Sequence, residues 1–151
     1  MPLTPPHVFT ILIVDDRPEN ILSLEEILGH PGRRFLRAGS GNEALKLVLK
    51  TENIGLIMLD VQMPDMDGFE VAHILKSHSR TKDIAIIFVT AISKDEKYAL
   101  KGFEEGAVDY LHKPLDVNIT RAKVNVFERL YFAQYHLARS LEDVGRINKQ
   151  L

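Results

Sequence analysis

The 151-residue sequence contains no cysteine and no long uninterrupted run of apolar residues. Without cysteine the chain has no disulfide, no thiolate metal site and no cysteine nucleophile, and this absence suits a reducing cytoplasm. No apolar run approaches the roughly 18 residues that a membrane-spanning helix needs. We therefore expect a cytoplasmic protein that has no membrane segment.

An excess of basic residues is missing as well. The chain has 19 Lys and Arg against 21 Asp and Glu, a formal net charge of -2. No strong basic field would attract nucleic-acid phosphates, so we expect no nucleic-acid partner. Residues 1–7 are rich in proline and lack the basic and then apolar order of a signal peptide, which favours a disordered N-terminal arm.

Five short apolar runs alternate with segments of helical spacing. The runs cover residues 8–14, 34–38, 55–59, 84–89 and 107–111. The first, third and fourth are nearly all apolar, as in strands covered on both faces, whereas the second and fifth are weaker, as edge strands can be. The alternation predicts an α/β fold with a doubly wound, five-stranded parallel sheet. A flavodoxin-like strand order of 2-1-3-4-5 fits best, although the pattern alone leaves that order open.

Two helix starts are readable between these runs. Ser40 to Glu43 and Ser93 to Glu96 each fit a capping box, in which the serine side chain accepts a hydrogen bond from the amide three residues on. Pro18 stands where a first helical turn would begin, a position at which its missing N–H costs nothing.

The last part of the chain has a different pattern. Residues 117–151 contain no proline and a single glycine, Gly145. Apolar or small residues recur there with a/d heptad spacing, namely Val126, Leu130, Ala133, Leu137, Ser140, Val144, Ile147 and Leu151. The pattern predicts that the domain of residues 8–130 continues into a helical extension, residues 131–151, which dimerises as a coiled coil. An amphipathic surface helix is the alternative, and a continuous helix would be on the order of 50 Å long.

Polar residues follow four of the predicted strands. Asp15 and Asp16 follow the first, Asp60 the third, Thr90 the fourth and Lys113 the fifth. Ligands of open α/β sheets bind outside the carboxyl ends of the strands, so these five side chains are expected to meet in one crevice.

The residue types in this crevice favour phosphoryl transfer. Three neighbouring carboxylates repel one another, and a hard cation such as Mg²⁺ would compensate them. The cation, the Lys113 ammonium and the Thr90 hydroxyl would stabilise charge on a phosphoryl group, and Asp60 would be the nucleophile. Each residue also has an ordinary structural interpretation. The aspartate pair could cap a helix, Thr90 could bond backbone at a strand end, and Lys113 could be a solvated surface lysine.

Three segments carry a resemblance to a known family. Ile13 to Asp16, Leu59 to Gly68 and Tyr110 to Leu115 resemble the motifs of response-regulator receiver domains, in the same order and spacing, over roughly residues 8–130. The resemblance implies that Asp60 accepts phosphate from a phosphohistidine on a sensor histidine kinase or a phosphotransfer protein.

The resemblance also implies roles for the other site residues. Asp16, Asp60 and the main-chain carbonyl of Gln62 would ligate Mg²⁺, and Asp15 would act mainly through water. Thr90 and Lys113 would contact the phosphate. Lys113 and Pro114 would be joined by a cis peptide bond.

In this family, phosphorylation draws the threonine inward and frees space for an aromatic residue at the position of Tyr110. Tyr110 alone could also be a packed strand residue. The output is a conformation, so we expect a switch that passes its state through the C-terminal helix, and not an enzyme.

Two other functions use similar residues. A haloacid-dehalogenase-type phosphatase needs a second aspartate two residues after its nucleophile, where this chain has Gln62. A nucleotide-binding switch needs a glycine-rich Lys-Ser/Thr loop, which is missing. His136 lacks the acidic and proline neighbours of a kinase histidine, and the spacing of His73 and His78 is poor for a metal pair on a helix.

Overall fold

The computed structural model describes residues 8–91 and 108–150 of the chain. Its strands are β1 (Phe9–Val14), β2 (Arg33–Ala38), β3 (Ile54–Asp60), β4 (Ala85–Thr90) and β5 (Val108–His112). Its helices are α1 (Pro18–Leu28), α2 (Gly41–Lys50), α3 (Gly68–Lys76) and α5 (Val117–Gln150). The predicted arm of residues 1–7, the capping box from Ser93 to Glu96 and Leu151 lie outside the described residues, as does the side chain of Ile147.

All five strands are parallel, and their order is β2-β1-β3-β4-β5. The predicted flavodoxin-like order is therefore confirmed, and each predicted strand agrees with the observed one to within a residue at either end. β2 and β5, whose sequences are the least apolar, form the two edges.

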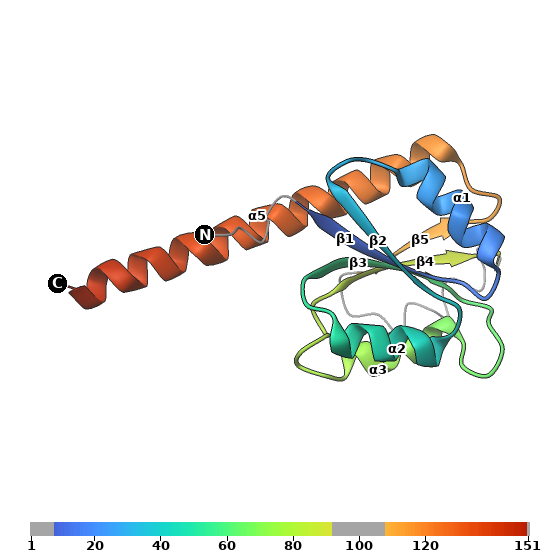
Figure 1. Cartoon of the computed structure of the whole chain (residues 1–151), viewed down its shortest axis with the longest axis horizontal. Helices are drawn as coiled ribbons and strands as arrows, with labels where there is room; N and C mark the ends of the chain where they lie inside the picture. The colour runs from blue at the N-terminus through green and yellow to red at the C-terminus, as the bar shows by residue number, and fades with distance from the viewer. Residues whose placement is uncertain (1–7, 92–107, 151) are drawn as a thin grey trace.

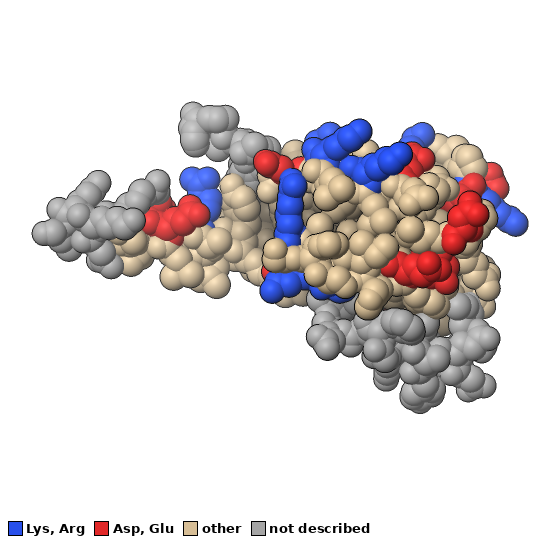
Figure 2. Space-filling view, turned by 90° about the horizontal axis from the view of Figure 1, so that it is seen from below, with Lys and Arg blue, Asp and Glu red and all other residues tan. Residues whose placement is uncertain are grey.

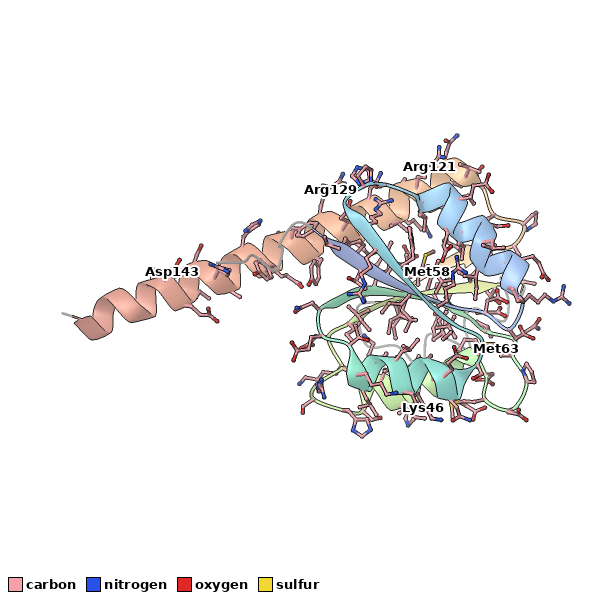
Figure 3. All side chains as sticks on the ribbon, in the orientation of Figure 1. Lys46, Met58, Met63, Arg121, Arg129 and Asp143 are labelled. Carbon is pink, nitrogen blue, oxygen red and sulfur yellow. The ribbon has the colours of Figure 1, made fainter. Side chains whose placement is uncertain are left out.

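Helices cover both faces of the sheet (Figure 1). Because side chains alternate along a strand, neighbouring residues of β1 enter different layers of the core. Leu12 packs on the side of α2 and α3 with Phe88, whereas Ile11 and Ile13 pack on the side of α1 and α5. Met58 of the central strand is fully buried, as the view with all side chains shows (Figure 3).

The two predicted helix starts that fall on described residues, at Pro18 and Ser40, are present with one difference. α1 begins at Pro18. The Ser40 hydroxyl accepts from the Glu43 N–H at 3.1 Å, but the Glu43 carboxylate returns to the N–H of Gly39 and not to that of Ser40. A full reciprocal capping box, which the sequence analysis missed, begins α3 between Asp67 and Glu70.

α5 extends far beyond the sheet as one continuous helix and crosses the predicted boundary at residue 130 (Figure 1). Its first half lies beside α1, where Arg121 and Arg129 are found, and Asp143 lies on the projecting half (Figure 3). The Arg121 side chain donates to the carbonyl of Ile27 at 3.0 Å.

Two further contacts fix the base of α5. Arg33 of β2 donates to both carboxylate oxygens of Glu128 at 3.1 Å. The Phe9 ring lies 5.5 Å from Tyr131 and 6.2 Å from Phe132, between ring centroids. Hydrogen bonds and ring contacts, most of them partly buried, therefore set the direction in which α5 leaves the domain.

The position of the Phe9 ring also depends on the absence of a side chain at Gly55. A Cβ atom at Gly55 would overlap the Phe9 ring. We expect Gly55→Ala to lower the free energy of unfolding by about 1–3 kcal/mol, as overpacking in a core does. Denaturant unfolding measures this change. The matched control is Gly145→Ala, where a Cβ would meet nothing within 4 Å. Equal stability of Gly55→Ala and the parent chain would contradict the packing argument.

Candidate functional site

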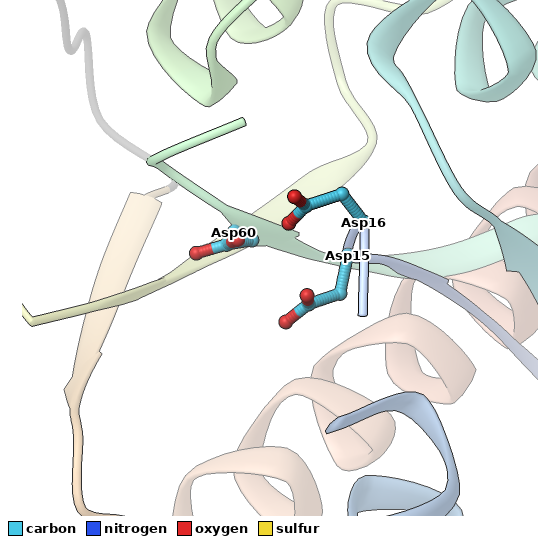
Figure 4. A group of neighbouring side chains, drawn as sticks. All are labelled: Asp15, Asp16 and Asp60. Carbon is cyan, nitrogen blue, oxygen red and sulfur yellow. The ribbon is translucent and has the colours of Figure 1, made fainter. Parts of the chain in front are cut away.

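Three carboxylates meet at the carboxyl ends of two central strands. Asp15 and Asp16 directly follow β1, and Asp60 is the last residue of β3. One oxygen from each of the three lies within 4.8 Å of the others, and Figure 4 shows the three carboxyl groups close together where the strands end. The three acidic residues of the predicted crevice thus meet, because parallel neighbouring strands end at the same edge.

Lys113 lies between two of these carboxylates. Its ammonium is 3.3 Å from Asp60 Oδ1 and 3.7 Å from Asp15 Oδ2. Both carboxylates are almost completely buried, with Asp15 3% and Asp60 5% exposed, whereas Lys113 is partly exposed. The ion pairs therefore form where screening by water is weak, and they offset part of the repulsion within the acidic cluster.

The two aspartates after β1 have different surroundings. The Asp15 carboxylate accepts from the Arg17 N–H at 2.9 Å and from the Asn20 side-chain amide at 3.1 and 3.3 Å. Asp16 is exposed to solvent. Asp15 thus also stabilises the start of α1, and Asp16 is the carboxylate of the cluster that remains open to solvent.

The electrostatic environment makes ionised Asp60 costly. Burial raises the pKa of the Asp60 carboxyl above its ordinary value, and the negative charges of Asp15 and Asp16 raise it as well. The ammonium of Lys113 acts in the opposite direction, but the net effect on the pKa is upward.

The turn after Asp60 depends on a glycine. The Gly68 N–H donates to the Val61 carbonyl at 2.9 Å, and a Cβ at Gly68 would overlap the Asp60 carbonyl. Asp65 in this turn has a positive φ of 69°. Gln62, whose carbonyl was predicted to bind metal, is exposed two residues beyond Asp60, and its role stays a prediction.

Thr90 and Tyr110 lie on neighbouring strands next to this cluster. Thr90 is the buried last residue of β4, and its carbonyl accepts from the Lys113 N–H at 2.9 Å. The Tyr110 ring is buried and stacked on Phe88, with 5.7 Å between centroids. The Lys113–Pro114 peptide bond is cis, as the resemblance implied.

Sequence reasoning missed three residues that the structure connects to the site, namely Asn20, Asp109 and Lys123. The Asp109 carboxylate accepts from the Tyr110 N–H at 2.7 Å and from the Lys123 ammonium at 3.0 Å. Lys123 also donates to the Tyr110 carbonyl at 2.7 Å, so it links β5 to α5. Spacing along the chain carries no signal for contacts between separate elements. Asn20, five residues after Asp15, could have been suspected from the predicted helix start.

The cluster fits a hard divalent cation. It offers carboxylate oxygens, which Mg²⁺ prefers, from two adjacent strand ends. One of the three residues is exposed, which leaves access for water and for phosphate oxygens.

Comparison with known proteins agrees with this site. The family model of the response regulator receiver domain matches residues 11–125. The chain belongs to this family. It is a receiver domain of two-component systems, and domains of this family act as regulators that interact with histidine kinases or phosphotransfer proteins and bind Mg²⁺ at their acidic pocket.

The receiver domain is 41% identical, over 77% of this chain and 26% of the relative, to a Vibrio cholerae protein named "Probable cyclic di-GMP phosphodiesterase". It is 33% identical to Protein PilH of Pseudomonas aeruginosa, over 76% of this chain and 93% of PilH. The structure of chemotaxis protein CheY4 of Vibrio cholerae matches with a TM-score of 0.67 and 30% identity, over 78% of this chain and 95% of CheY4.

The chain spans about half or less of the length of most curated relatives that it matches. Among the described helices, none is long and apolar enough to cross a membrane.

The raised pKa of Asp60 predicts how stability depends on pH without metal. The favourable contribution of protonated Asp60 is complete below the unfolded-state pKa of aspartate, about 3.9, and is lost as pH rises through the higher folded-state pKa. We therefore expect Asp60→Asn to raise the melting temperature at pH 7 in EDTA. The gain should disappear near pH 3, where both chains are uncharged at this position. Thermal unfolding at the two pH values measures it, and an equal gain at both would contradict the assignment.

Proposed function

We propose that Asp60 is the phosphoacceptor of this receiver domain. A carboxylate oxygen of Asp60 attacks the phosphorus of a phosphohistidine, a P–O bond forms, the P–N bond breaks, and the imidazole leaves. The observation that carries this proposal is the position of Asp60. It is buried at a strand end, paired with the Lys113 ammonium at 3.3 Å, and next to two further carboxylates.

Mg²⁺ would be held by Asp16, Asp60 and the Gln62 carbonyl, with Asp15 acting through water. The cation supplies charge neutralisation for the incoming phosphoryl oxygens. The donors already bound to Asp15 support this division, since three groups of the protein occupy its oxygens whereas Asp16 is exposed.

The remaining chemistry belongs to the side chains of this chain. Lys113, already beside Asp60, would bind an oxygen of the attached phosphoryl group, and the Thr90 hydroxyl would bind another.

The donor is a histidine kinase or a phosphotransfer protein, and the chain is a switch and not an enzyme. Location in the cytoplasm and the lack of a nucleic-acid partner remain predictions. The described residues of the face with α2 and α3 carry charges of both signs (Figure 2).

The direct test is labelling with acetyl phosphate and Mg²⁺. Asp60→Asn should abolish covalent phosphate incorporation, because an amide is a poor nucleophile. Intact-mass spectrometry measures the added phosphoryl group. The matched control is Asp65→Asn in the following turn, which should be labelled like the parent chain. Labelling of Asp60→Asn at another residue would refute the assignment, and steady turnover of phosphate esters would instead favour a phosphatase.

The output of the switch would pass through α5. Tyr110, whose ring packs on Phe88 beside the site, has both its N–H and its carbonyl bound to the Asp109–Lys123 pair. A shift of Tyr110 when Thr90 binds phosphate would therefore act on Lys123 and on α5.

The projecting half of α5 would join a second copy of the chain in a coiled coil. Leu137 is 61% and Val144 54% exposed, and both belong to the predicted seam. Leu141, which the heptad prediction left out, is 64% exposed and lies four residues after Leu137. Such a stripe of apolar residues is costly in water and is buried when two helices pair.

Dimerisation is tested by sedimentation at tens of micromolar, with and without beryllofluoride. The parent chain should sediment as a dimer in at least one state, and replacing both Leu137 and Leu141 by Lys should give monomers. Leu49→Lys on α2 is the matched control, because Leu49 is equally exposed at 63% but lies away from α5. Monomers of the parent chain under both conditions would contradict the proposal.

A further inference from the structure

Asn20 makes a side-chain contact to the acidic cluster that none of the predicted roles explains. It lies in the first turns of α1, and its amide donates to both oxygens of Asp15, at 3.3 and 3.1 Å. The Arg17 N–H binds Asp15 Oδ1 in addition, and Lys113 lies beside Oδ2. Both oxygens of the Asp15 carboxylate therefore have donors. One of these donors is the Lys113 ammonium, which also contacts Asp60.

The amide of Asn20 suits this position because it is neutral. A buried carboxylate needs hydrogen-bond donors, and a donor to a charged group stabilises more than a donor to a neutral one. A lysine or arginine in place of Asn20 would also satisfy Asp15, but its charge would weaken the attraction of the cluster for a cation. An amide orients Asp15 and leaves the net charge of the site unchanged.

We infer that Asn20 is a positioning residue for phosphoryl transfer and acts through Asp15. By fixing the Asp15 carboxylate, it keeps Oδ2 toward the Lys113 ammonium and so holds Lys113 between Asp15 and Asp60. The inference rests on the proposed function of Asp60 and deepens it. Without Asn20, the Asp15 carboxylate would lose its fixed orientation, and the Lys113 ammonium would lose one of its two anchors.

The first experiment compares Asn20→Leu with the parent chain at saturating Mg²⁺. We expect the rate constant for labelling by acetyl phosphate to fall about tenfold, as a misplaced reacting group costs. The Mg²⁺ dissociation constant, measured by calorimetry, should change by less than about threefold, since Asp16 and Asp60 remain. Ser23→Ala is the matched control, because Ser23 lines the same hollow beside Asp15 and Lys113. Asn20→Ala is tested in parallel, in case leucine perturbs the start of α1.

A double-mutant cycle with Asp15→Ala separates positioning from a general structural effect. If Asn20 acts through Asp15, Asn20→Leu causes no further loss of labelling rate in the Asp15→Ala background. The same cycle is measured in the metal-free protein by thermal unfolding. There Asn20→Leu should lower the melting temperature of the parent chain by about 4 °C and that of Asp15→Ala by much less.

The outcomes distinguish this inference from the proposed function. A labelling rate of Asn20→Leu within twofold of the parent overturns the inference, and so does an equal loss in both backgrounds. Absence of labelling in the parent chain itself overturns the assignment of Asp60. In that case the unfolding cycle still decides whether Asn20 stabilises Asp15. Additive effects of Asn20→Leu and Asp15→Ala on the melting temperature would show that the two residues do not act together.

Discussion

The arrangement of the site depends on one electrostatic constraint, the repulsion among three carboxylates that the fold brings within 4.8 Å of one another. Two of them are almost completely buried, so water cannot screen their charges well. The structure reduces the repulsion with a shared ammonium, that of Lys113, and with neutral donors on Asp15. Burial, and after it the negative charge of Asp15, still hold the pKa of the Asp60 carboxyl above its ordinary value. Such a cluster fits a divalent cation, whose charge would offset the remaining repulsion among the carboxylates.

The same residues connect the site to the rest of the molecule. Lys113 binds the site with its ammonium, and its N–H binds the Thr90 carbonyl, so the ends of β4 and β5 are joined beside Asp60. Tyr110 follows on β5, and both of its backbone groups are bound to the Asp109–Lys123 pair. The base of α5 is held by Arg33 through Glu128 and by Phe9 through Tyr131 and Phe132. The described contacts therefore run from the site through β5 to the base of α5.

The relatives differ in how much of their own length this chain covers. The chain covers nearly all of PilH but about a quarter of the Vibrio phosphodiesterase relative, so the same receiver fold occurs alone and joined to other domains. A fold shared in this way does not specify an output. In the part of this chain that the structure describes, α5 is long and carries exposed leucines beyond the sheet.

The sequence by itself determined the order of the elements and predicted the three carboxylates and the lysine that the structure brings together. Strand cores such as that of β3 are continuous apolar runs, and residues at strand ends must meet when the strands are parallel. It could not determine which partner each charge chooses, because ion pairs join segments far apart in the chain. The contact of Lys113 with Asp15 as well as Asp60, the amide of Asn20 on Asp15, and the Asp109–Lys123 pair were decided by tertiary packing. Periodicity along a chain reports which face of an element is buried, whereas hydrogen bonds between elements depend on distances that exist only after folding.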